Sequence, residues 1–131
     1  MSLHILIVDD DPLMRTLLEH HLERAGYSVT LAATGREGLK AAFCKLPHII
    51  ILDIMMQEMD GFTVVRELKN IPATRTIPII IMTARVDVLE TLRDECARLG
   101  VDVFLTKPFD PALLLSEVKR LTGHANDPEQ P

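Results

Sequence analysis

Short aliphatic runs alternate along the chain with longer stretches in which apolar residues recur every three or four positions. The short runs lie at residues 3–8, 28–32, 48–52, 77–82 and 101–105. The longer stretches carry apolar stripes over residues 14–25, 39–46, 62–68, 86–99 and 114–121. Runs of these lengths and periods are typical of β-strands and amphipathic α-helices respectively. The chain is therefore predicted to contain five strands and five helices in strict alternation.

Residues that favour helix starts and stops mark the boundaries of these stretches. An acid-proline pair or a capping box precedes three of the helices, at Asp11-Pro12, at Thr34 to Glu37 and at Asp110-Pro111. Gly26 and Gly100 lie where two helices must stop, and glycine can take the left-handed conformation there. Asp60-Gly61 is expected to form the turn that leads into the helix over 62–68, where glycine would tolerate a positive φ.

Strict alternation predicts a parallel sheet with helices on both faces, because each right-handed crossover returns the chain in the same direction. The runs at 3–8, 48–52 and 77–82 are almost wholly apolar, as central strands covered on both sides should be. The run at 28–32 is more polar and suits an edge. This pattern predicts a doubly wound α/β fold with strand order 2-1-3-4-5, in which ligands bind beyond the carboxyl ends of the strands.

Four of the predicted strands run into polar residues at those carboxyl ends. Asp9 and Asp10 follow the first strand, Asp53 the third, Thr83 the fourth and Lys107 the fifth. Carboxylates about 4 Å apart repel by roughly 4 kcal/mol per pair at an effective dielectric constant of about 20, so such a cluster needs neutralising. A proton, Lys107 or a divalent metal could do this. Because Lys107 alone leaves two negative charges, a hard cation with oxygen ligands, Mg²⁺, is the natural completion.

A metal beside a free carboxylate favours phosphoryl transfer, because an aspartate can attack a phosphoryl group and form an acyl phosphate. The hypothesis assigns Asp53 as nucleophile, Asp9 and Asp10 as metal ligands, Lys107 as counter-charge and Thr83 as the hydroxyl that donates a further hydrogen bond. The backbone carbonyl of Met55 could complete the coordination of the metal.

Length, charge and cysteine content narrow the class of protein. With 131 residues, of which 47% are hydrophobic, the chain suits a single globular domain, predicted over 1–122 and followed by a polar tail or linker over 123–131. No apolar run approaches the length of a membrane span. The formal net charge of -5 argues against direct nucleic-acid binding. Two cysteines without metal-type spacing, and no signal peptide before the first strand, favour a cytoplasmic location.

Four motifs together resemble the receiver domain of bacterial two-component response regulators, which has a flavodoxin-like fold. They are ILIVDDDP, LDIMMQEMDGF, IIIMTA and FLTKPF, and the resemblance covers residues 3 to 122. It implies that Asp53 accepts a phosphoryl group from a phosphohistidine on a sensor histidine kinase or phosphotransfer protein. It also implies that Asp10, Asp53 and the Met55 carbonyl hold Mg²⁺, with Asp9 acting largely through water. Such a domain is a signalling switch and not a metabolic enzyme, although it assists its own phosphorylation and dephosphorylation.

The resemblance further assigns Thr83 and Phe104 as a switch pair. In the family, phosphorylation turns this hydroxyl toward the phosphoryl group and moves the aromatic ring inward. The surface formed by the helix over 86–99, the fifth strand and the last helix then binds an output domain or target protein. The same surface commonly dimerises in relatives, which leaves a homodimer open. The Lys107-Pro108 bond resembles the family's cis peptide bond.

The chain departs from the family pattern at one visible position and leaves three other classes to weigh. Gln57 stands where many members have proline, while Met55 and Arg85 occupy positions that tune phosphoryl lifetime in the family. A haloacid-dehalogenase-type phosphatase would need a second aspartate at position 55, and a flavodoxin-like ligand-binding module would not place VDDDP against a phosphate. The remaining alternative is an unphosphorylated, receiver-like protein-binding module.

Overall fold

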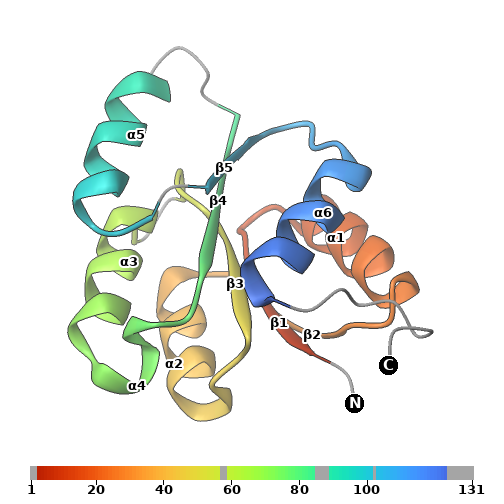
Figure 1. Ribbon diagram of the computed structural model, residues 1–131, viewed down its shortest axis with the longest axis horizontal. Helices are drawn as coiled ribbons and strands as arrows, with labels where there is room; N and C mark the ends of the chain where they lie inside the picture. Colours follow the sequence, from red (N-terminus) through yellow and green to blue (C-terminus); the bar gives the residue numbers. More distant parts are fainter. Residues whose placement is uncertain (1–2, 57–58, 85–88, 102, 124–131) are drawn as a thin grey trace.

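The structure is a computed structural model that describes residues 3–56, 59–84, 89–101 and 103–123. Its centre is one sheet of five parallel strands in the order β2-β1-β3-β4-β5 (Figure 1). The strands are β1 (His4–Val8), β2 (Ser28–Ala32), β3 (Ile49–Asp53), β4 (Ile79–Thr83) and β5 (Val103–Thr106). The doubly wound α/β fold and its strand order, predicted from the apolar pattern, are confirmed.

Helices cover both faces of this sheet (Figure 1). They are α1 (Pro12–Arg24), α2 (Gly35–Lys45), α3 (Gly61–Asn70), α4 (Pro72–Arg75), α5 (Leu89–Arg98) and α6 (Pro111–Thr122). Helices α1 and α6 lie on one face, and α2, α3 and α5 lie on the other. Within the described ranges, no helix is both long enough and apolar enough to span a membrane.

The short helix α4 is an addition to the five predicted helices. It occupies only four residues, too few to show an apolar period, and Pro72 begins it. The Thr74 side chain is fully buried and its hydroxyl donates a hydrogen bond to the Leu68 carbonyl at 2.6 Å. This bond ties α4 to the end of α3 and leads the chain into β4.

Two apolar layers enclose the sheet, one on each face. Along β1, Leu6 and Val8 pack into the layer under α2, α3 and α5, whereas Ile5 and Ile7 pack into the layer under α1 and α6. This alternation is the period of two expected of side chains on a strand. Every residue of β3 is buried, as predicted for a central strand. The strand ends that carry the polar residues are therefore held by a core on both sides.

The predicted helix caps are present. The side chains of Asp11, Thr34 and Asp110 accept hydrogen bonds from the backbone N–H groups of Leu13, Glu37 and Ala112, at 3.0, 3.1 and 3.0 Å. Gly26 and Gly100 take positive φ values of 98° and 88°, as expected at helix ends. Gly123 closes α6 with φ 64°, and the division between a domain over 1–122 and a tail over 123–131 stays a prediction, since residues 124–131 lie outside the described part.

Candidate functional site

Three aspartates from two neighbouring strands meet at the carboxyl edge of the sheet. Asp9 and Asp10 follow β1, and Asp53 is the last residue of β3, which pairs directly with β1. One carboxylate oxygen from each lies within 4.8 Å of the others. Asp9 and Asp53 are buried, at 2% and 5% exposed, whereas Asp10 is exposed. The acidic cluster therefore reaches solvent through Asp10.

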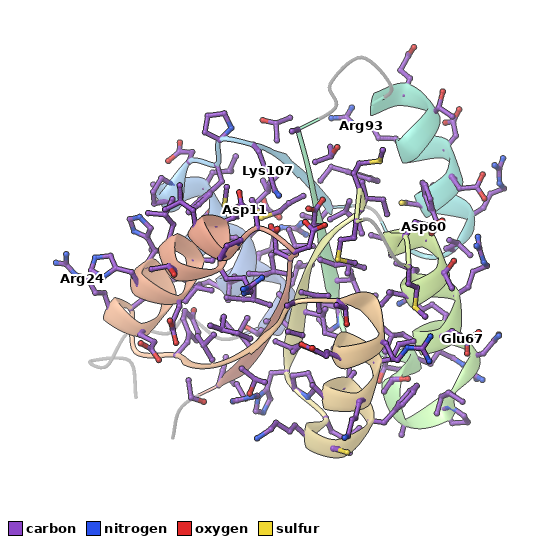
Figure 2. The ribbon with its side chains drawn as sticks, turned by 180° about the vertical axis from the view of Figure 1, so that it is seen from behind. Asp11, Arg24, Asp60, Glu67, Arg93 and Lys107 are labelled. Atoms are coloured by element: carbon purple, nitrogen blue, oxygen red, sulfur yellow. The ribbon has the colours of Figure 1, made fainter. Side chains whose placement is uncertain are left out.

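Lys107, the residue directly after β5, brings a positive charge into this cluster. Its Nζ lies 2.8 Å from Asp9 Oδ2 and 3.0 Å from Asp53 Oδ2. The residue follows β5, and its backbone N–H donates to the Thr83 carbonyl at 2.9 Å. Figure 2 shows Lys107 and Asp11 at the same end of the molecule. The Lys107-Pro108 peptide bond is cis, as the sequence resemblance implied.

Backbone N–H groups complete the hydrogen bonding of the two buried carboxylates. Asp9 Oδ1 accepts from the N–H of Asp11 at 2.9 Å, and Asp53 Oδ1 accepts from the N–H of Met55 at 3.0 Å. Each bond spans two positions, in the manner of an Asx turn. In each buried carboxylate, one oxygen thus accepts a hydrogen bond from the backbone of its own loop, and the other oxygen pairs with the Lys107 ammonium group.

Burial and charge act in opposite directions on the pKa values of this site. Burial raises the pKa of Asp53, and the negative charge of Asp9 adds to this, while the hydrogen bonds from Met55 and Lys107 oppose it. Burial by itself would lower the pKa of Lys107, but the hydrogen bonds and charges of Asp9 and Asp53 outweigh burial and raise it. Lys107 is therefore held as an ammonium ion. With all three carboxylates ionised, two negative charges remain uncompensated.

The donor set of the cluster fits a hard divalent cation. Carboxylate oxygens suit Mg²⁺, which is commonly bound through one or two carboxylates and keeps several waters. Asp10 is exposed, so an ion in this position could retain water on its open side. Zn²⁺ would favour nitrogen and sulfur ligands, and the three clustered groups are all oxygen donors.

Thr83 and Phe104 lie on the two strands beyond β3. Thr83 ends β4 and is fully buried. Phe104 of β5 pairs in register with Ile81, so Phe104, Ile81 and Thr83 share one face of the sheet, the face covered by α5. The Phe104 ring is partly buried, and its centroid lies 6.0 Å from Arg93 Cζ of α5. Two positions singled out in the sequence lie outside the described residues. They are Gln57, where many family members have proline, and Arg85, at a position that tunes phosphoryl lifetime in the family.

Gly61 shapes the loop after Asp53, although not in the predicted way. Gly61 does not use the positive φ that glycine would tolerate, because it is the first residue of α3 and Asp60 caps that helix. A Cβ atom at position 61 would lie 2.6 Å from Ile54 Cα and 3.0 Å from the Asp53 carbonyl oxygen. The position thus requires glycine for close approach of two backbones. Periodicity gives no signal for such a contact, because it is made only in three dimensions.

Sequence reasoning also gave no role to Arg15 of α1. Its guanidinium Nη1 donates a hydrogen bond to the main-chain oxygen of Asp9 at 2.7 Å. The only signal in the sequence is an arginine one turn into the helix that follows the acidic loop.

The chain matches the family model of the response regulator receiver domain over residues 5–119 and therefore belongs to this family. It is 44% identical over 125 residues to the response regulator PleD of Caulobacter vibrioides, covering 93% of this chain and 26% of PleD. It is 36% identical over 121 residues to the alkaline phosphatase synthesis transcriptional regulatory protein PhoP of Bacillus subtilis, covering 92% of this chain and 49% of PhoP. The chain thus spans about a quarter of one relative and about half of the other.

Solved structures agree with this assignment. A putative response regulator from Chloroflexus aurantiacus superposes with a TM-score of 0.87 at 34% identity. The match covers 95% of this chain and 100% of that chain. The receiver domain of the sensor histidine kinase PA1611 from Pseudomonas aeruginosa has a TM-score of 0.84 at 32% identity, covering 94% and 99% of the two chains. That structure contains a magnesium ion coordinated in its active site cleft.

Family membership settles the class of protein. Receiver domains are signalling switches that accept phosphate from histidine kinases and regulate output domains, and magnesium binding at an acidic cluster is typical of them. The match assigns the chain to this family and not to the haloacid-dehalogenase-type phosphatases or the flavodoxin-like ligand-binding modules.

Proposed function

We propose that this chain is a phosphoacceptor receiver domain in which Asp53 takes a phosphoryl group from a sensor histidine kinase or phosphotransfer protein in the presence of Mg²⁺. The observation that carries the proposal is the setting of Asp53. Its carboxylate is buried at the end of β3, lies 3.0 Å from the Lys107 ammonium group and belongs to an acidic cluster that opens to solvent at Asp10. The two free cysteines, Cys44 and Cys96, suit the reducing cytoplasm, where we place this reaction.

Each residue of the site has a defined part in the proposed transfer. An oxygen of Asp53 forms a bond to phosphorus while the phosphorus–nitrogen bond of the donor breaks, and its electron pair returns to the imidazole. The Lys107 ammonium group and the Thr83 hydroxyl then donate hydrogen bonds to phosphoryl oxygens. Bound Mg²⁺, held by Asp10, Asp53 and the Met55 carbonyl with Asp9 acting through water, would supply further compensation of the phosphoryl charge.

The proposed switch runs from Thr83 to the surface formed by α5, β5 and α6. When the Thr83 hydroxyl turns toward the phosphoryl group, it leaves space that the Phe104 ring enters. Support comes from the two side chains sharing one face of the sheet, with Phe104 lining a surface hollow of about 410 Å³ between α5 and α6. We propose that this surface binds an output domain or target protein, with a second copy of the chain as the other candidate.

Intact mass measurement after incubation with acetyl phosphate tests the proposal. The wild-type chain should gain one phosphoryl group with Mg²⁺ present and none with a chelator. Asp53→Asn should gain none in either condition. Equal phosphoryl uptake by Asp53→Asn would contradict the assignment of the acceptor. If the wild-type chain stays unmodified in every condition, the unphosphorylated protein-binding module becomes the better interpretation.

A further inference from the structure

Arg15 holds the backbone on both sides of Asp10. Its guanidinium donates to the main-chain oxygen of Asp9 at 2.7 Å, and its own backbone N–H donates to the main-chain oxygen of Asp11 at 3.0 Å. The first bond is charge-assisted and short, which places it among the stronger kinds of hydrogen bond. A single residue of α1 therefore bonds to the peptide group that leads into Asp10 and to the Asp11–Pro12 peptide group one residue beyond it.

The Asp10 carboxylate differs from its two neighbours in having no side-chain anchor. Asp9 and Asp53 each accept one bond from a backbone N–H and one from Lys107. Across the described residues, no donor is hydrogen-bonded to the exposed carboxylate of Asp10. Its direction consequently depends on the two peptide groups that flank it. Asp9 Oδ1 holds the Asp10–Asp11 peptide through the N–H of Asp11, and Arg15 holds the Asp9–Asp10 peptide.

We propose that Arg15 is a positioning residue that orients the Asp9–Asp10 peptide group and so presents the Asp10 carboxylate to Mg²⁺. The inference rests on the proposed function, since it requires the ion to bind in this cluster. Outer groups that orient a metal ligand commonly change metal affinity by about 10-fold to 100-fold when they are removed. Arg15 acts here through the backbone and does not contact the ion.

The charge of Arg15 acts in the opposite direction from its positioning role. A guanidinium close to a cation site repels the cation, so removing its charge should by itself tighten Mg²⁺ binding. Removing the hydrogen bond to the Asp9 carbonyl should instead weaken binding, because Asp10 loses its fixed direction. The sign of the change in affinity therefore separates the two roles.

Calorimetric titration with Mg²⁺ tests the proposal on three variants of the full chain. Arg15→Gln removes the charge and the hydrogen bond, and Arg15→Lys keeps the charge but lacks the guanidinium. Arg24→Gln is the matched control, because it removes one exposed arginine at the far end of the same helix (Figure 2). We expect the dissociation constant to rise by about tenfold for Arg15→Gln, by less for Arg15→Lys, and not at all for Arg24→Gln.

A second readout distinguishes metal affinity from phosphoryl chemistry. Labelling of Arg15→Gln by acetyl phosphate should be slow at limiting Mg²⁺ and should approach the wild-type rate at saturating Mg²⁺. Mg²⁺ binding by Arg15→Gln that is as tight as wild type, or tighter, would overturn the positioning role alone. A wild-type chain that binds no Mg²⁺ would overturn the proposed function and this inference with it. If Arg15→Gln does not fold, the comparison of Arg15→Lys with wild type decides, and equal affinities there overturn the inference.

Discussion

The ammonium group of Lys107 lies 3.0 Å from a carboxylate oxygen of Asp53, although 54 positions separate the two residues in the chain. The contact exists because β3, β4 and β5 are neighbours in the sheet and end at the same edge. The backbone N–H of Lys107 also bonds to the carbonyl of Thr83. A change in charge at Asp53 therefore acts directly on the segment that joins β5 to α6.

Lys107→Ala should destabilise the chain most strongly when divalent metal is absent. The substitution leaves the buried carboxylates of Asp9 and Asp53 without their shared cation, and breaking a buried ion pair costs about 3 kcal/mol or more. Added Mg²⁺ should recover part of this loss, because the ion supplies the missing positive charge. Urea unfolding with chelator and with Mg²⁺ measures both effects.

Lys40→Ala is the control for this prediction, since Lys40 is an exposed lysine of α2. Its free energy of unfolding should match that of wild type in both conditions. Equal stability of Lys107→Ala and wild type in chelator would show that the ion pair does not contribute to the folded state.

Thr83→Val should separate phosphorylation from the change at the surface. The substitution keeps a branched side chain at a fully buried position. It removes the hydroxyl that is proposed to turn toward the phosphoryl group and donate a hydrogen bond to it. Intact mass should still show one phosphoryl group. The ¹⁹F resonance of a fluorinated phenylalanine at position 104 should then shift on phosphorylation in wild type but not in Thr83→Val.

Thr106→Val is the matched control for that experiment, because Thr106 pairs with Thr83 in the sheet but is exposed. It should retain the shift of the Phe104 resonance. A full shift of the Phe104 resonance in Thr83→Val would mean that the signal reaches β5 without this hydroxyl.

Lys107→Ala should still accept some phosphoryl groups. As in Thr83→Val, the ¹⁹F resonance at position 104 should not shift when it does.

Gly61→Ala should slow phosphoryl uptake and destabilise the fold. The new methyl group would lie 2.6 Å from Ile54 Cα, so the backbone just after Asp53 must shift. Overpacking of this kind typically costs about 1–3 kcal/mol. Gly123→Ala provides the comparison, since its φ of 64° makes alanine unfavourable there while the site stays intact. Labelling rates should fall for Gly61→Ala alone, and a normal rate would argue that the loop tolerates the shift.

Stability should decrease on mild acidification because of His4. Burial lowers the pKa of His4, and the positive charges of Lys45 and His48 lower it further. Since the folded pKa lies below the unfolded value of 6.5, protonation favours the unfolded chain. The stability that His4 contributes is present above the unfolded pKa and is lost as the pH falls through the folded pKa.

Urea unfolding between about pH 7.5 and about pH 5 measures this loss. His4→Gln should show a weaker dependence on pH than wild type, whereas His20→Gln, at an exposed histidine, should keep the wild-type dependence. Parallel curves for wild type and His4→Gln would contradict the assignment to His4.

The fold was predictable because its signals are local and repeated. The apolar runs of β1, β3 and β4 and the caps at Asp11 and Asp110 each depend on a few adjacent residues, and together they imply the strand order. The cluster of polar residues followed from that order, since parallel strands end at one edge. Features made by a single contact across the fold were not predictable. The close backbone approach at Gly61 and the hydrogen bond from Arg15 to a backbone oxygen produce no periodic pattern in the sequence. Helix α4 is a single turn and is too short to show an apolar period.

The most direct test of the central claim is to locate the phosphoryl group chemically. Borohydride reduces an aspartyl phosphate to homoserine, so the chain is treated with acetyl phosphate and Mg²⁺, reduced, digested and mapped by mass spectrometry. The proposed function requires homoserine at position 53, and none there when a chelator replaces Mg²⁺. Homoserine at position 9 or 10, or at no position, would contradict the claim that Asp53 is the acceptor.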